Sequence, residues 1–275
     1  MPNMIVCVKQ IADPEAPPGS FKVDEAAKQV LPAAGVSQVV SPFDEQAVEA
    51  ALRIKDAQGG KITVLSLGKN FVMDVIKKPL SMGADEMILL QDPAFEGSDS
   101  HTTAYALAMA IKKVGEYDLI FCGRQAADWD AGQVGSGIAE ILGIPAITPA
   151  KNVELVNGNV KVERVVTDGY EVIEASTPLL IMVSNELGEP RYPKLKGIMA
   201  AAKKEVPTWN AQDIGADAAK LGTDGARAKV HKLFIPVKEG ECEIIEGDGP
   251  EEAAVNLALK LRETRLILRR LLING

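Results

Sequence analysis

The chain has 275 residues, of which 47% are hydrophobic, 25% charged and 4% aromatic, and its formal net charge is -8. This composition fills an ordinary globular core and argues against whole-chain disorder, collagen or coiled coil. The negative charge and the scarcity of aromatic rings disfavour nucleic-acid binding, because such proteins carry a positive footprint and stacking platforms.

The sequence shows no membrane or export signal. Its longest apolar runs, such as residues 179–183, are too short to cross a bilayer. No basic stretch followed by an apolar region and a cleavage site begins the chain. The three cysteines, Cys7, Cys122 and Cys242, are too widely spaced and too few for a disulfide framework. We therefore expect a cytoplasmic protein without stable membrane insertion.

The first two-thirds of the chain alternates strands and helices, which is typical of parallel α/β units. We expect strands at residues 4–9, 61–67, 86–90 and 118–122. Helices are expected at residues 41–55, 73–81 and 102–114, and a fourth helix ends at residue 142. Ser41 and Asp44 have the spacing of a capping box, and Pro42 stands at the first helical position, where proline is favoured. This pattern predicts a doubly wound, mostly parallel, Rossmann-like sheet of the adenine-nucleotide-binding kind.

An antiparallel addition follows the parallel region. Asn157-Gly158 is a strong two-residue hairpin turn. The strands expected around it and beyond it are residues 153–156, 160–166, 171–175 and 179–183. The predicted fold is thus an α/β sheet with an antiparallel hairpin addition.

The chain loses its core character after Asn185. Residues 215–228 are small and polar, and a charged helix is expected at residues 250–272. A segment with so little apolar surface needs a partner or stays mobile. We therefore predict a nucleotide-binding core at residues 1–184 and an extended partner-binding arm at residues 185–275.

Standard catalytic signatures are missing. The sequence has no phosphate-loop lysine motif, HExxH, CxxC or GxSxG. His101 and His231 are far apart and are typical of caps or surface positions. Asp128 and Asp130 are two carboxylates in one loop, which usually face solvent or accept backbone hydrogen bonds. We expect neither a catalytic residue nor a metal.

The loop at residues 123–137 is the most informative segment. It follows a buried strand and opens a helix, the place where open α/β sheets bind ligands and where helix N–H groups attract phosphate. Gly132 and Gly135 would let the backbone approach a ligand, and Gln125 and Gln133 offer amide groups. The alternative is that the glycines only make a turn and allow close helix packing.

Other strand ends should meet this loop in a doubly wound sheet. The first strand ends near Cys7 and Lys9, the capped helix begins at Ser41, and the second strand ends near Leu67. These positions would line one crevice. The simpler interpretation makes Cys7 a small core residue.

An extended segment beyond the core carries residue types that anchor interfaces. Arg191, Tyr192 and Leu195 lie among prolines, and Tyr and Arg are enriched at binding hot spots. A proline-rich linker is the alternative.

Several motifs together resemble the β subunit of electron transfer flavoproteins. They are VxVKQ near the N-terminus, SPFDExAVExALRxKD from Ser41, MGAD from Met82, GRQAxDxDxxQVG from Gly123, and the run from Val162 to Val206. The resemblance extends over about 240 residues. It implies a heterodimer in which the arm wraps an α subunit, and in which an FAD held mainly by α carries electrons between dehydrogenases and an acceptor.

The resemblance also implies which residues bind a nucleotide in this subunit. The family's contacts fall, by match, on Cys7, Ser41, Pro42, Phe43, Asp44, Leu67, Gly123, Arg124, Gln125, Ala126, Asp128, Asp130, Ala131, Gly132, Gln133 and Val134. Arg124 and Lys9 are candidates for positive charge near phosphate or the flavin ring. Leu195 matches the exposed leucine by which the family recognises acyl-CoA dehydrogenases.

The nucleotide implied by the resemblance is AMP in one branch of the family and a second FAD in the electron-bifurcating branch. Ser41 replaces an asparagine of many relatives, and Leu67 a cysteine of AMP-holding ones. The loop ends in AGQVG, where AMP-holding members typically show NQTGQ or NATGQ. We therefore expect FAD, with AMP as the alternative.

The resemblance predicts an electron-carrying subunit whose redox chemistry belongs to the flavin. In the bifurcating branch, NADH delivers an electron pair that is divided between ferredoxin or flavodoxin and the α-subunit FAD. Two rivals remain from the residues alone: a nucleotide-binding regulator without a redox role, and an enzyme that hydrolyses or transfers a nucleotide. The predicted arm disfavours the first, and the missing phosphate-loop lysine disfavours the second.

Overall fold

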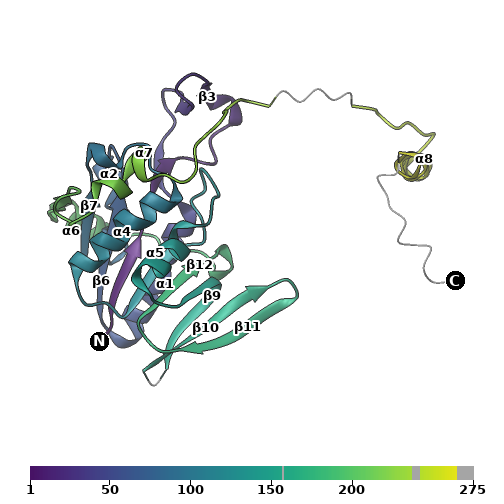
Figure 1. The fold of residues 1–275 in the computed structure, drawn as a ribbon. Coiled ribbons are helices and arrows are strands. Elements are labelled where there is room, and N and C mark those ends of the chain that lie inside the picture. The colour runs from purple at the N-terminus through teal and green to yellow at the C-terminus, as the bar shows by residue number, and fades with distance from the viewer. Residues whose placement is uncertain (157, 237–241, 265–275) are drawn as a thin grey trace. The chain divides into compact units, whose positions relative to one another are not determined.

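The computed structural model describes residues 1–156, 158–236 and 242–264, and within them a nine-stranded sheet forms the centre of the fold (Figure 1). Its strand order is β11-β10-β9-β12-β8-β1-β6-β7-β13. The bounds are β1 Asn3–Cys7, β6 Lys61–Leu67, β7 Glu86–Leu90, β8 Leu119–Gly123, β9 Ala146–Val156, β10 Asn159–Val166, β11 Gly169–Ala175, β12 Leu179–Val183 and β13 Thr208–Trp209. The predicted α/β class, mostly parallel with an antiparallel hairpin, is confirmed.

The central strand β1 is parallel to both of its neighbours. Val6 is level with Val64 of β6 on one side and with Phe121 of β8 on the other. The chain first builds outward from β1 through β6 and β7, and then crosses back to place β8 on the opposite side of β1. The carboxyl ends of β1 and β8 therefore mark the point where the strand order reverses, which is where such sheets bind ligands.

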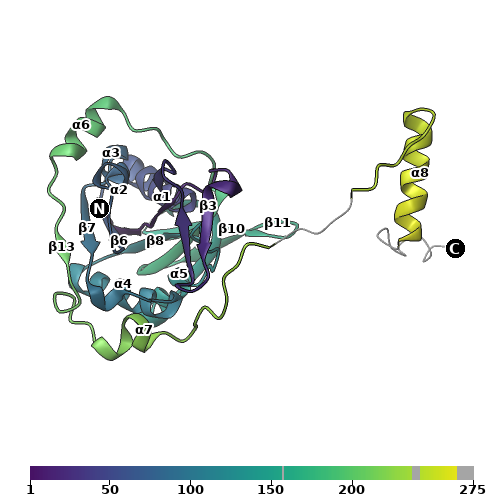
Figure 2. The same cartoon turned by 90° about the horizontal axis from the view of Figure 1, so that it is seen from above.

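Helices cover both faces of the sheet (Figure 2). One face carries α1 (Pro42–Gln58), α2 (Met73–Ile76), α3 (Lys78–Met82) and α6 (Leu195–Lys203), and the other carries α4 (Ser100–Val114), α5 (Val134–Leu142) and α7 (Gly222–Gly225). The strands alternate between the two cores, so that Val6 packs towards α1 and Ile5 towards α4. This two-faced burial explains the continuous apolar runs of the central strands.

Most predicted elements of the core are found, and the differences have local causes. The helix expected at residues 73–81 is two short helices, with Lys77 between α2 and α3 and Pro79 in the first turn of α3, where a missing N–H is tolerated. The helix after the 123–137 loop begins earlier than predicted, at Val134. The hairpin joins β9 and β10, although Asn157 of its turn lies outside the described residues.

The connection from β1 to α1 contains strands that the sequence analysis did not predict. Two small antiparallel sheets form there, β2 (Gln10–Ala12) with β5 (Gln38–Val40) and β3 (Phe21–Asp24) with β4 (Gln29–Pro32). A 3-10 turn, η1 (Pro18–Ser20), precedes β3. These strands are three or four residues long, too short for a clear alternating pattern.

Residues 185–233 share one compact unit with the predicted core of residues 1–184, and residues 234–275 form a second unit. Ile214 and Leu221 are buried against the α4 face, and Trp209 extends the sheet beside β7. The remaining short helical turns of the first unit are η2 (Pro93–Phe95), η3 (Asn185–Leu187) and η4 (Ala218–Lys220). Whether the segment beyond residue 184 contacts another subunit stays a prediction.

The second unit contains one described helix, α8 (Pro250–Glu263), which agrees with the first part of the charged helix predicted at residues 250–272. Residues 265–272 of that prediction lie outside the described part of the chain. Among the described residues, no helix is long and apolar enough to cross a membrane.

Candidate nucleotide site

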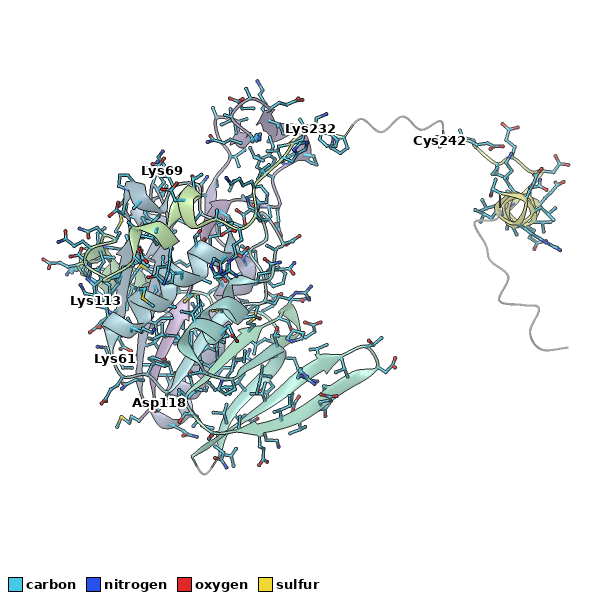
Figure 3. All side chains as sticks on the ribbon, viewed as in Figure 1. Lys61, Lys69, Lys113, Asp118, Lys232 and Cys242 are labelled. Atoms are coloured by element: carbon cyan, nitrogen blue, oxygen red, sulfur yellow. The ribbon has the colours of Figure 1, made fainter. Side chains whose placement is uncertain are left out.

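The predicted crevice residues gather at one end of the sheet. Figure 3 labels Lys61 and Asp118 at the amino ends of β6 and β8, and Lys69 beyond the carboxyl end of β6. The candidate site lies at the Lys69 end, where the loop after β1, the start of α1 and the loop after β8 meet. Hydrogen bonds join these three segments, so residues far apart in sequence are held together.

Asp44 is the buried connection between the segments. Its Oδ2 accepts a hydrogen bond from the backbone N–H of Lys9 (2.8 Å), and its Oδ1 accepts one from the N–H of Gly123 (3.1 Å). Burial raises the pKa of Asp44 to about 7, although both N–H bonds and the charge of Lys9 oppose this rise. The carboxyl group therefore ties the ends of β1 and β8 to the first turn of α1.

The predicted capping box is wrong. Ser41 is the N-cap of α1 and Pro42 the first helical residue, but Ser41 makes no side-chain cap bond. Its hydroxyl instead accepts a long hydrogen bond (3.4 Å) from the N–H of Ala127, in the loop after β8. The Asp44 carboxyl group likewise bonds across the crevice, to the N–H groups of Lys9 and Gly123. Both side chains serve tertiary contacts that sequence spacing does not reveal.

The loop after β8 is a tight turn. The N–H groups of Trp129 and Asp130 donate to the carbonyl of Ala126 (3.3 and 2.9 Å). Asp130 and Gly132 have φ of 51° and 63°, in the left-handed region. For Gly132 this is the conformation that a glycine adopts without strain, whereas for Asp130 it is one that acidic residues visit occasionally.

Ion pairs and amide bonds close the outer rim. The Lys9 ammonium lies 2.7 Å from Asp128 Oδ2, and Gln125 donates to Asp130 (2.8 Å). The Arg124 guanidinium lies 5.6 Å from the ring centre of Phe43. Thus Asp128 and Asp130 have partners within the protein. Among the described residues, no three metal-ligating side chains gather.

The amino end of α5 is the part of the crevice suited to an anion. Gln133 occupies the N-cap without a side-chain cap bond, and the first turn holds no acidic residue. Within the described residues, the N–H groups of Val134, Gly135 and Ser136 have no acceptor. Gly135 is buried, whereas Gln133 and Ser136 are exposed, so this helix end opens to solvent and its N–H groups call for a partner from outside the chain. A phosphate would supply it.

Two glycines of the region serve packing. A Cβ on Gly135 would lie 2.8 Å from Cγ of Met182, and one on Gly123 would lie 2.5 Å from Oδ1 of Asp44. The helix packs closely on β12 because Gly135 has no side chain. The alternative of close packing, kept open in the sequence analysis, therefore applies to Gly135, while Gly132 makes the turn.

The floor of the site consists of small apolar side chains. Cys7 and Cys122 are level with each other on β1 and β8, both buried on the α4 side, and Leu67 packs there too. The pKa of the Cys122 thiol is raised, mainly by its hydrogen bond with the Cys7 thiol and to a smaller extent by burial. A thiol with a raised pKa is a poor nucleophile, which favours a packing role for this pair.

The predicted docking residues lie elsewhere on the first unit and fall into two groups. Tyr192 and Leu195 are 90% and 73% exposed, and Ile198 and Met199 are exposed beside them. We call these four residues the docking patch. Arg191, in contrast, binds acidic side chains of α1 in its own chain.

Comparisons with known proteins identify the family. An electron transfer flavoprotein domain matches residues 29–214. The electron transfer flavoprotein subunit beta of Thermoanaerobacterium thermosaccharolyticum is 41% identical over 96% of this chain and 100% of its own length. That of Megasphaera elsdenii is 40% identical over 92% and 94%, and the caffeyl-CoA reductase–Etf complex subunit CarD of Acetobacterium woodii is 37% identical over 96% and 100%.

The chain belongs to the electron transfer flavoprotein β subunit family. The resemblance found in the sequence is thereby confirmed. Membership means a role in electron transfer, a flavin or adenine nucleotide as the bound group, and an α subunit as partner. Neither the identity of the nucleotide nor the contacts to it follow from membership.

Three further residues of this electron transfer flavoprotein β subunit stand out in the structure, and sequence analysis did not single out two of them, Ser136 and Glu49. Ser66 is buried at the carboxyl end of β6, and its hydroxyl has no hydrogen-bond partner among the described residues. Ser136 stands exposed in the first turn of α5. Glu49 is, besides Asp44, the other buried acid of α1, whose remaining buried residues are apolar. That charge at a core-facing position was the one signal visible in the sequence.

Proposed function

We propose that the crevice between β1 and β8 binds the phosphate-bearing part of a nucleotide cofactor. The unpaired N–H groups of the first turn of α5, at the point where the strand order reverses, carry this proposal. The proposed ligands are Cys7, Lys9, Ser41, Pro42, Phe43, Asp44, Leu67, Gly123, Arg124, Gln125, Ala126, Asp128, Asp130, Ala131, Gly132, Gln133 and Val134.

These residues take different roles in the proposal. The N–H groups beginning at Val134 bind phosphate, and Arg124 adds positive charge. Asp44 is a positioning residue, because it holds the two loops that form the walls. When a flavin is bound, it supplies the one- and two-electron chemistry. The chain's own residues bind it and orient it, so no general acid, base or nucleophile is required.

We propose FAD in this site, with AMP as the alternative. Val134 carries no hydroxyl, whereas the resemblance gives AMP-holding relatives a threonine there. Ala131 and Gly132 are small and exposed, which leaves room beyond a first phosphate. With FAD in β, the complex would be of the electron-bifurcating type: NADH would supply an electron pair, divided between a low-potential acceptor such as ferredoxin or flavodoxin and the FAD held mainly by α.

Counting the cofactors tests this choice. The purified heterodimer is extracted with acid and the released nucleotides are separated and quantified by chromatography. We expect two FAD per heterodimer. One FAD and one AMP would overturn the bifurcation proposal and leave a one-flavin electron carrier, whereas no adenine nucleotide beyond the α-subunit FAD would overturn the proposed site itself.

We further propose that the segment beyond residue 184 contacts the α subunit and that the heterodimer works in the cytoplasm. Residues 234–275 form their own unit, and α8 exposes Val255, Leu257 and Leu259. Exposed apolar side chains on one helix are typical of a surface that a partner covers. Removing residues 234–275 should abolish heterodimer formation in size-exclusion chromatography. A truncated chain that still binds α would contradict the proposal.

The docking patch is proposed to bind an acyl-CoA dehydrogenase-type partner. An exposed leucine at the start of a short, packed helix and an exposed tyrosine just before that helix form an anchor that loses little entropy on binding. The caffeyl-CoA reductase–Etf complex subunit among the relatives supports a partner of this class. Leu195→Ala should weaken docking and leave flavin content unchanged.

A further inference from the structure

Arg191 is bound to helix α1 at several points. Its Nε lies 2.7 Å from Glu49 Oε2, its backbone N–H donates to the same oxygen (3.2 Å), and its Nη2 reaches Asp56 (2.8 Å). Glu49 is only 5% exposed and also accepts a hydrogen bond from Arg53 (3.1 Å). Burial would raise the pKa of Glu49, but the bonds from Arg191 and Arg53 outweigh it and hold the pKa below its usual value.

The helix that carries the docking patch is also fixed beyond Arg191. Gly197 of α6 packs so closely on the carbonyl of Ser81 in α3 that a Cβ would overlap it. The Lys77 ammonium donates to the carbonyls of Ala202 and Lys204 at the end of α6 (3.3 and 2.8 Å). Therefore α6 has attachments in its middle and at its end, and Arg191 supplies the one before its first turn.

The docking patch lies on the solvent side of the segment that Arg191 and α6 attach to the core. Leu195, Ile198 and Met199 have the spacing of one helix face, and Tyr192 lies in the non-helical segment just before the helix. Ala201 of the same helix is buried on the core side. The exposed apolar face and the attached face are thus opposite sides of one short helix, and the patch can keep a fixed orientation.

We propose that Arg191 is a positioning residue, which holds the docking patch in its binding orientation by binding Glu49 and does not itself contact the partner. This inference rests on the proposed docking of an acyl-CoA dehydrogenase. A planar guanidinium matches a carboxylate through two parallel bonds, which a lysine does not reproduce. Arg191 and Leu195 should therefore act through one and the same interaction.

A double-mutant cycle on the intact heterodimer tests the inference. The KM of the heterodimer as electron acceptor of a purified acyl-CoA dehydrogenase is measured for Leu195→Ala, Arg191→Ala and the double variant. We expect each single variant to raise KM by about tenfold or more and to leave kcat within about twofold. The double variant should raise KM by less than the product of the two single effects, because Arg191 and Leu195 act through the same docking patch and are not additive.

Controls separate positioning from general damage. Arg164→Ala breaks another arginine–glutamate pair, with Glu171 on the β10–β11 hairpin, and should leave KM unchanged. Arg191→Lys should give an intermediate KM. Flavin content and reduction by a small dye should match wild type in every variant. Should Arg191→Ala fail to fold, Gly197→Ala takes its place, because it displaces α6 without removing a charge. We expect it to show the same non-additivity with Leu195→Ala.

The outcomes distinguish the inference from the proposal beneath it. A normal KM for Leu195→Ala would overturn the docking of the dehydrogenase itself. A raised KM for Leu195→Ala with a normal KM for Arg191→Ala would overturn only the positioning role. Full additivity, or loss of flavin in Arg191→Ala, would also overturn it, because Arg191 would then act directly or on the whole fold.

Discussion

The crevice draws its residues from segments that are far apart in sequence, whereas the docking patch comes from a single stretch between Tyr192 and Met199. In the crevice, buried backbone N–H groups and one buried carboxyl group hold the walls together. At the patch, apolar side chains face solvent while charged residues attach the segment to α1 from behind. A cofactor that stays bound needs buried polar partners, and a transient partner needs an exposed apolar anchor on a rigid support.

The two regions share one structural element. Helix α1 carries Ser41 and Asp44 at its beginning, beside the crevice, and Glu49 and Asp56 further along, beneath the segment that leads to the patch. Damage at the crevice should therefore spread to cofactor binding and stability together. Damage at the patch should affect docking alone. Changes to single contacts within the crevice, taken from the most to the least buried, test that difference.

Replacing Gly123 by alanine should have the largest effect. The new Cβ would lie 2.5 Å from Asp44 Oδ1 and 2.8 Å from the carbonyl carbon of Phe43, so the start of α1 must move. Overpacking of this kind costs about 1–3 kcal/mol or more. We expect a lower melting temperature and loss of the β-subunit nucleotide. Gly19→Ala is the matched control, since a Cβ there meets nothing within 4 Å. Full nucleotide content in Gly123→Ala would contradict the close packing of Gly123 against the start of α1.

Asp44→Asn tests the buried carboxyl. An amide offers one acceptor oxygen, so the N–H of Lys9 or Gly123 is left without a partner, at a cost of about 1–3 kcal/mol. Because the pKa of Asp44 is raised from 3.8 to about 7, its contribution to stability is fully present below pH 3.8 and is lost as pH rises through 7. The advantage of wild type over the variant should thus shrink as pH rises from about 4 to about 7 and level off above that. Unfolding midpoints measured across that range check the sign, and a growing advantage would contradict it.

Sequence analysis predicted the sheet and the position of the loop after β8 because both depend on local patterns. Buried parallel strands appear as apolar runs, and the loop follows one of them. The partners of Asp44 and Ser41 were not predictable, since they are backbone N–H groups supplied by other loops. Arg191 was interpreted as an interface residue because of its type alone. Its pairing with Glu49 depends on how residues 185–191 lie across α1, and a single sequence carries no such information.

The next largest effect is expected at the amino end of α5. Gln133→Asp puts a carboxylate where we propose a phosphate, while Gln133→Asn provides an equally good N-cap without charge. Both variants should be at least as stable as wild type without nucleotide. Only the aspartate should weaken nucleotide binding, by about tenfold, through charge repulsion at short range. The affinities are measured by titrating nucleotide-free heterodimer with nucleotide. Equal affinities in the two variants would contradict a phosphate position at the amino end of α5.

The smallest effect should come from the ion pair on the outer rim. Lys9 and Asp128 join the same two loops as Asp44 does, but their side chains are 43% and 29% exposed, whereas Asp44 is buried. Exposed pairs contribute about 0–1 kcal/mol, because water screens them and two long side chains lose freedom. Lys9→Met should therefore lower the free energy of unfolding by less than about 1 kcal/mol. The difference from wild type should vanish in about 1 M salt, where the screening length is only about 3 Å. A loss of unfolding free energy that is as large as that of Asp44→Asn and insensitive to salt would mean that water does not screen the Lys9–Asp128 pair. The rim pair and the buried Asp44 carboxyl group would then contribute equally, against our expectation.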